Sequence, residues 1–146
     1  MTSNTPVLRP YRDILPTVGQ RAYVDPAATV IGDVVLGDDV SIWPGTIVRG
    51  DVNFIRIGAR TNVQDGAVIH CTYQRFATTI GSYVSIAHNA IVHGCTLEDH
   101  VLIGMGAIVM DGAVIGTGSI IAAGAIVTQH TQVEPGSIYA GNPARF

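Results

Sequence analysis

An aliphatic residue recurs every six positions through most of the chain, and a small or β-branched residue follows most of these positions four residues later. Neither the roughly 3.6-residue period of an α-helix nor the alternation of an ordinary strand produces this spacing. A six-residue period is typical of a parallel β-helix, in which each hexapeptide forms one face of a triangular coil and three make a turn of about eighteen residues. The aliphatic positions are Val30, Leu36, Ile42, Val48, Ile57, Val63, Ile69, Ile80, Ile86, Val92, Leu97, Ile103, Val109, Ile115, Ile121, Val127 and Val133. The pattern therefore predicts an all-β fold built from hexapeptide repeats.

The length of 146 residues predicts a single domain. Residues 1–28 lack the repeat, and we expect them to form an extended lead-in that caps the first coil. Residues 29–134 are expected to form the β-helix and residues 135–146 a C-terminal extension, because Pro135 and Gly136 mark the end of the repeat.

The six-residue step is interrupted three times. It is nine residues between Val48 and Ile57, eleven between Ile69 and Ile80, and five between Val92 and Leu97. The nine-residue step predicts a bulge, and the eleven-residue step predicts a five-residue insertion within residues 71–79. Since eleven is six plus five, this insertion leaves the stacking of the coils unchanged.

The composition and charge of the chain argue against some classes of binding partner and suggest its location. The net charge is −3 and the chain contains no basic run, which argues against nucleic acid or an anionic membrane as partner. No apolar run is long enough to span a bilayer, and the proline-containing N-terminus does not resemble a signal peptide. Two cysteines are too few for a disulfide framework, so we expect a reducing, cytoplasmic location. Because only 13% of the residues are charged, we also expect part of the surface to be buried in an oligomer.

Three histidines suggest the chemistry. Arg49, His70 and His93 each follow an aliphatic residue of the same face, so they form an outward-pointing column. His70 and His93 are 23 residues apart, which is one turn of about eighteen residues plus the five-residue insertion. They therefore lie one rung apart, close enough to share an ion. His88 belongs to another face, so a site with all three histidines requires His88 from a neighbouring subunit and gives three equal sites in a trimer. Three imidazoles with an open position are typical of a catalytic Zn²⁺ site.

The common interpretation of a single surface histidine is a solvated or interface side chain, and we apply it to His100 and His130. It remains an alternative for the other three. Cys71 and Cys95 flank the histidine column; they can act as a thiolate ligand or redox pair, although small apolar packing residues are the more common case.

Further polar residues fall on the two faces that carry the histidines. Arg49 and Asp65 can form an ion pair across a subunit interface, with Asp51 joining it, or can be separately solvated. Gln64 is well placed to orient a metal-bound hydroxide or a carbonyl oxygen, and Asn62 can assist it; either can instead cap a turn.

At these residues the sequence resembles the γ-class carbonic anhydrase family and its γ-carbonic-anhydrase-like relatives. The resemblance covers nearly the whole chain. It rests on the segments RPYRDILPTVG, VIGDVVLGDDVSIWPGTIVRGDVNFIRIG, TNVQDGAVIH, AHNAIVHGCTLEDHVLIGMGAIVMDGAVIG and YAGNPARF.

The resemblance implies a left-handed coil and a homotrimer. It also implies that His70, His88 and His93 bind Zn²⁺, or Fe²⁺ or Co²⁺, with His88 donated across the interface. The implied activity is the reversible hydration of CO₂ to bicarbonate by a metal-bound hydroxide. The resemblance further assigns Arg49 and Asp65 to an intersubunit ion pair, Asp51 to the RGD motif beside it, and Gln64 and Asn62 to the active site.

The chain departs from the family in ways that predict slow turnover. The insertion CTYQRFATT lacks the acidic residue that shuttles protons in archaeal members, and Val52 replaces a second glutamate. Ala87 replaces the usual glycine before His88, and the sequence stops at Phe146, where relatives usually continue into a C-terminal helix. Two alternative functions therefore stay open: a metal-binding scaffold without useful turnover, and a CoA-dependent acyltransferase or thioesterase.

A first prediction concerns the shared site. The substitution His88→Ala should abolish metal binding and leave the coil intact, as measured by metal content and circular dichroism. Mixed trimers of His88→Ala and His70→Ala subunits should regain some sites, because each variant keeps the ligand that the other lacks. The absence of any recovery would mean that each site is built within one chain.

Overall fold

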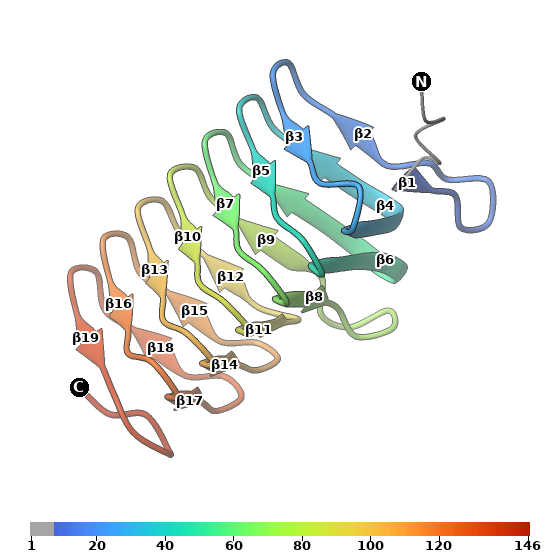
Figure 1. The fold of residues 1–146 in the computed structure, drawn as a ribbon. Coiled ribbons are helices and arrows are strands. Elements are labelled where there is room, and N and C mark those ends of the chain that lie inside the picture. Colours follow the sequence, from blue (N-terminus) through green and yellow to red (C-terminus); the bar gives the residue numbers. More distant parts are fainter. Residues whose placement is uncertain (1–7) are drawn as a thin grey trace.

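The computed structural model describes residues 8–146, which form a parallel β-helix (Figure 1). Short strands follow one another at nearly regular intervals, as the six-residue period predicts. They are β1 (Leu8–Arg9), β2 (Thr17–Val18), β3 (Tyr23–Val24), β4 (Thr29–Leu36), β5 (Ser41–Ile42), β6 (Ile47–Ile57), β7 (Asn62–Val63), β8 (Val68–His70), β9 (Thr78–Ile80), β10 (Ser85–Ile86), β11 (Ile91–His93), β12 (Thr96–Leu97), β13 (Leu102–Ile103), β14 (Ile108–Val109), β15 (Val114–Ile115), β16 (Ile120–Ile121), β17 (Ile126–Val127), β18 (Gln132–Val133) and β19 (Ile138–Tyr139).

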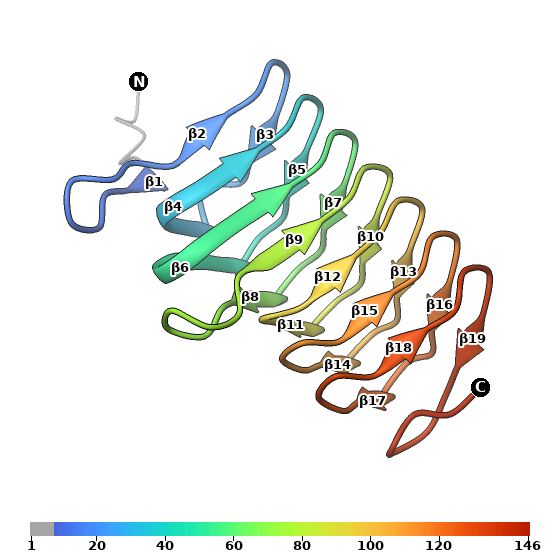
Figure 2. The same cartoon turned by 180° about the vertical axis from the view of Figure 1, so that it is seen from behind.

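The strands form a prism with three faces, and every strand pair is parallel (Figures 1 and 2). Face C is the seven-stranded sheet in the order β19-β16-β13-β10-β7-β5-β3, which gives about seven turns. The other sheet bends around one edge of the prism, because the first part of β6 pairs with β8 and its last part pairs with β9. Face A consists of β1, the first parts of β4 and β6, β8, β11, β14 and β17. Face B consists of β2, the last parts of β4 and β6, β9, β12, β15 and β18.

The aliphatic positions of the repeat form the core. On face C, Ile42, Val63, Ile86, Ile103 and Ile121 are fully buried and pair with one another on successive turns. The same register aligns the residues that follow them on the outside of the prism. The place of a hexapeptide within its turn therefore determines the face on which its residues lie, and the turn determines their height along the prism.

The long interruptions of the repeat occur near the edge between faces A and B. The nine-residue step lies in β6, where the register with β4 shifts between Gly32 and Val34. The insertion is a small loop closed by an antiparallel bridge between Thr72 and Phe76. Both of these irregular segments lie beside the histidines of face A, which end β8 and β11.

The predicted all-β fold of parallel coils is confirmed, and residues 8–146 contain no helix. No helix in this described part could therefore cross a membrane. The handedness stays an expectation of the family resemblance. Within the predicted lead-in, β1 and β2 pair with β4 and β3 pairs with β5, so residues 8–24 already form an irregular first coil. Residues 1–7 of that lead-in lie outside the described part of the chain.

Candidate metal centre

Two histidine rings meet on face A. His70 and His93 end β8 and β11 and pair directly across these strands, as the spacing predicts. Their ring centroids are 5.1 Å apart, and Nδ1 of His70 lies 3.1 Å from Nε2 of His93. The side chains are 18% and 34% exposed, so both rings lie at the surface of the prism and can be reached from outside.

A carboxylate contacts the outer nitrogen of each ring. Nε2 of His70 lies 2.9 Å from Oδ1 of Asp51, and Nδ1 of His93 lies 2.6 Å from Oδ1 of Asp111. A carboxylate accepts a hydrogen bond, so each of these outer nitrogens carries the ring proton. The two inner nitrogens, which face each other at 3.1 Å, can then bind one shared proton or one metal cation through their lone pairs.

This donor set fits a metal ion. Two lone pairs at that separation repel each other unless a proton or a metal cation lies between them. Imidazole nitrogens about 2.0–2.1 Å from a tetrahedral Zn²⁺ are about 3.3–3.4 Å apart, close to the observed distance. Histidine ligands of metals also characteristically donate the other ring N–H to a carboxylate. The chemistry of the residues present therefore matches the group that the family resemblance implies.

Asp51 is held as an anion at the edge of the site. Its Oδ2 accepts a hydrogen bond from Nη1 of Arg49, and its Oδ1 also accepts one from the backbone N–H of Val52. Partial burial by itself would raise the pKa of Asp51. The hydrogen bonds from His70 and Arg49 outweigh burial, so the pKa of the carboxyl is lowered. The carboxylate can then accept the ring proton of His70 near neutral pH.

Asp111 was not among the residues that the sequence reasoning selected. It follows β14 on face A, one turn beyond His93, and its Oδ2 accepts a hydrogen bond of 2.7 Å from the hydroxyl of Thr72. An available signal was the MDG segment directly after Val109, because it places Met110 on the next rung of the histidine column and an acidic residue directly after it. The short connection between faces then turns the carboxylate toward His93.

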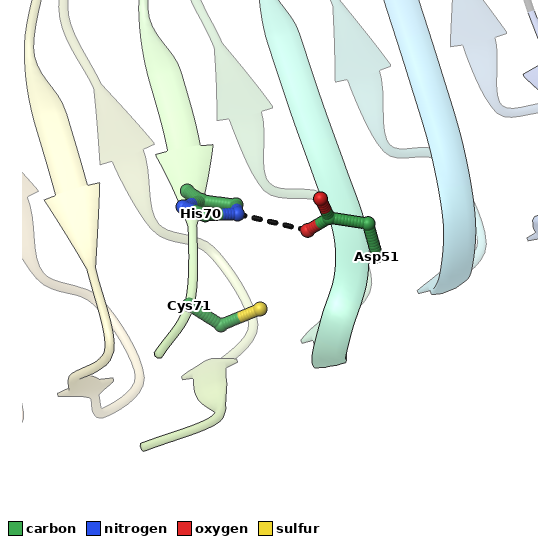
Figure 3. Close-up of side chains that lie close together, drawn as sticks. All are labelled: Asp51, His70 and Cys71. Carbon is green, nitrogen blue, oxygen red and sulfur yellow. Dashed lines mark hydrogen bonds and ion pairs between the residues drawn. The ribbon is translucent and has the colours of Figure 1, made fainter. Parts of the chain in front are cut away.

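A second possible ligand group is formed by Asp51, His70 and Cys71, whose ligand atoms lie within 4.8 Å of one another (Figure 3). Figure 3 shows Asp51 of β6 directed at His70 of β8. Sγ of Cys71 lies 3.3 Å from the carbonyl oxygen of Asn53, to which a thiol donates. Burial raises the pKa of the Cys71 thiol, whereas metal binding requires the thiolate. We therefore assign Asp51 and Cys71 to supporting and packing roles.

The side chains of the other cysteine and of two other histidines make packing contacts. Cys95 is buried, and burial raises its pKa to about 12, in keeping with a packing role. His100 stacks on Tyr83, and His130 packs edge-on against Phe76.

His88 lies on the other side of the prism, after β10 of face C. Its Nδ1 is 3.1 Å from Oδ1 of Asp65, and its side chain is 49% exposed. Nearby, Nε2 of Gln64 donates to Oδ1 of Asn62 at 3.0 Å, and Nδ2 of Asn62 donates to Oγ of Ser85 at 2.9 Å. A hollow of about 450 Å³ is lined by Ser41, Trp43, Asn62, Gln64, Asp65 and His88.

The predicted residues thus form two separate groups in one chain. Within residues 8–146, no group of three metal-binding side chains includes His88. Arg49 pairs with Asp51 and Asp65 pairs with His88, so the ion pair between Arg49 and Asp65 is not formed within one chain. That ion pair and the three-histidine site stay predictions about a contact between subunits.

Paired substitutions separate the two possible ligand groups. We expect Cys71→Ala to retain bound Zn²⁺, because its thiol donates to a carbonyl oxygen, and His93→Ala to lose it. Elemental analysis of the purified proteins measures this, with circular dichroism to verify folding. The reverse result, loss in Cys71→Ala and retention in His93→Ala, would assign the metal to Asp51, His70 and Cys71.

Known proteins are similar to this chain in sequence and in fold. The family described as "Bacterial transferase hexapeptide (six repeats)" matches residues 16–50 and 94–129. Protein YrdA of Escherichia coli (strain K12) is 51% identical over 145 residues, covering 95% of this chain and 79% of YrdA. The probable carbonic anhydrase of Methanocaldococcus jannaschii is 48% identical over 128 residues, covering 88% of this chain and 80% of the relative.

Among solved structures, a hexapeptide transferase family protein from Anaplasma phagocytophilum superimposes with a TM-score of 0.91 at 45% sequence identity. The match covers 95% of this chain and 81% of that protein. The relatives named carbonic anhydrase, which include one from Geobacillus kaustophilus at 35% identity, match over most of this chain. The chain therefore belongs to the γ-carbonic-anhydrase-like family of hexapeptide-repeat proteins.

Proposed function

We propose that this chain forms a homotrimer that hydrates CO₂ reversibly to bicarbonate at metal centres shared between its subunits. The observation that carries the proposal is the pair of imidazole nitrogens, one from His70 and one from His93, that face each other at 3.1 Å with a carboxylate behind each ring. A site with only two protein ligands is incomplete for a catalytic Zn²⁺ centre, which normally has three.

In the proposed trimer, His70 and His93 of one subunit and His88 of a neighbouring subunit hold Zn²⁺, or alternatively Fe²⁺ or Co²⁺. Held in this way, the ion would lower the pKa of water to about 7 and so make hydroxide, the nucleophile for CO₂, available at neutral pH. His88 suits this role because it is half-exposed on face C and its Asp65 partner can hold the ring orientation.

Gln64 and Asn62 are proposed to orient the reacting molecules. One N–H of the Gln64 amide is used by Asn62, which leaves the amide oxygen and a second N–H for substrate. Asn62 in turn donates a hydrogen bond to Oγ of Ser85, which helps to fix the position of the Gln64 amide. The insertion loop offers no acidic side chain, so we expect proton release to depend on the buffer and turnover to be slow.

Surface chemistry supports an assembly through faces A and C. Exposed apolar side chains on face A include Ile47 and Ile91, and those on face C include Leu102 and Ile120. The outward residues of face B are mostly polar, as at Arg56, Thr79, Thr96 and Gln132. Apolar rows of this kind mark surfaces that are buried on association. Packing face A of one chain on face C of another would bring the two half-sites together.

Acyl transfer from coenzyme A is the second candidate function. The similarity to hexapeptide transferases favours it, together with a largely apolar hollow of about 310 Å³ beside His93. Ile91, Ile108 and Met110 contribute to its lining and could contact an acyl or pantetheine chain. The carboxylate-backed histidine pair favours the metal-dependent reaction, because a single histidine base needs no facing imidazole.

Stopped-flow CO₂ hydration tests the proposal directly. Protein loaded anaerobically with Zn²⁺ or Fe²⁺ should show turnover that rises with buffer concentration, and His70→Ala should lose it together with the metal. His100→Ala is the matched control, because His100 stacks on Tyr83 away from the site, and should keep both. Full metal occupancy without turnover would refute CO₂ hydration, and assays with CoA esters would then separate a transferase from a scaffold.

A further inference from the structure

Asp111 links His93 to the insertion loop. Its side chain is only 15% exposed, and its two oxygens contact different residues. Oδ1 lies 2.6 Å from Nδ1 of His93, and Oδ2 accepts a hydrogen bond of 2.7 Å from the hydroxyl of Thr72. The three residues come from three consecutive turns of the prism, so this contact spans the site along its length.

The backbone is adapted to this contact at Gly94, directly after His93. A Cβ atom at this position would collide with Oδ1 of Asp111, and Gly94 also has a φ of 56°, in the left-handed region. Glycine therefore lets the carboxylate lie against the chain beside the His93 ring. Any larger residue would push Asp111 away from His93.

Thr72 is itself fixed by hydrogen bonds of its backbone. Its N–H donates to the carbonyl oxygen of Phe76 at 2.8 Å, which closes the insertion loop. Its carbonyl oxygen accepts a hydrogen bond of 3.1 Å from Nδ2 of Asn53, in the bulge of β6. The hydroxyl that reaches Asp111 thus belongs to a backbone segment held on two sides. The insertion loop therefore contacts the site through Thr72, although it contains no acidic residue.

We propose that Asp111 is a positioning residue for the metal ligand His93 and that Thr72 holds Asp111 in place. Asp111 keeps the ring proton on Nδ1, so that Nε2 of His93 presents its lone pair toward Nδ1 of His70. This inference rests on the metal centre of the proposed function and assigns two residues that support it. It also gives the insertion a role, which is to orient a ligand.

Asp111 differs from Asp51, which contacts the other ring. Oδ2 of Asp51 is paired with the cation of Arg49, whereas Oδ2 of Asp111 meets the neutral hydroxyl of Thr72. The negative charge of Asp111 is therefore directed mainly at His93. Loss of a carboxylate behind a histidine ligand typically lowers metal affinity by about 10–100-fold, and we expect Asp111→Ala to fall in this range.

The experiment measures metal binding separately from turnover. Zn²⁺ affinity is determined by competition with a chromophoric chelator, and the visible absorption spectrum of bound Co²⁺ reports the ligand geometry. The variants are Asp111→Ala, Asp111→Asn, Thr72→Val and Thr72→Ser. Asp99→Asn is the matched control, because Asp99 accepts a backbone hydrogen bond from Ser82 at a different edge of the prism. Melting temperatures of the metal-free proteins record any loss of stability.

We expect Asp111→Ala to weaken Zn²⁺ binding by about 10–100-fold and to shift the Co²⁺ spectrum. Asp111→Asn should show a smaller loss, because an amide oxygen still accepts the ring N–H; it also serves if the alanine variant does not fold. Thr72→Val should weaken binding and Thr72→Ser should restore it, because only serine keeps the hydroxyl. Asp99→Asn should leave affinity and spectrum unchanged.

Unchanged affinity and spectrum in folded Asp111 variants would overturn the inference, as would equal behaviour of Thr72→Val and Thr72→Ser. Wild-type protein that binds no metal would overturn it together with the proposed function. Metal binding that depends on Asp111 in a protein without CO₂ hydration would support the inference and refute the proposed activity.

Discussion

The parallel pairing of β8 with β11 is the constraint on which the site depends. It aligns His70 with His93 on adjacent strands, so that the two rings lie side by side. Adjacent strands of a sheet are only about 4.8 Å apart, which leaves two imidazoles room for one ion or proton between them. The carboxylates of Asp51 and Asp111 then determine which nitrogen of each ring faces that space. The fold therefore sets the positions of the two imidazole rings, and the two carboxylates set their tautomers.

The irregular segments of the coil supply the groups that the repeat cannot. Asp51 lies in the nine-residue step of β6, and Thr72 opens the insertion after β8. Both segments approach the histidines from the edge between faces A and B, and Asn53 of the first holds Thr72 of the second. The regular coils provide a rigid support, which suits a site whose ligands must be held in a fixed geometry.

Much of this arrangement could be predicted from the sequence, because a fixed period converts chain position directly into face and rung. The period predicted the parallel coils, the buried aliphatic positions and the adjacency of His70 and His93. It did not reveal Asp111 or Thr72, because their side chains lie beyond the strands, where local backbone geometry rather than the period sets direction. The ion pair expected between Arg49 and Asp65 would join two subunits, so it stays a prediction. In one chain Arg49 pairs with Asp51 and Asp65 pairs with His88.

A crystal structure of the Zn²⁺-loaded protein, with anomalous diffraction at the zinc edge, measures the metal centre most directly. We expect one zinc peak per chain at the boundary between two subunits, about 2.0–2.1 Å from Nδ1 of His70 and Nε2 of His93. His88 of the neighbouring subunit should complete the ligands, and Asp111 should remain behind His93. A peak bound by Asp51 and Cys71, or a centre built from one chain without His88, would contradict a metal site shared between subunits.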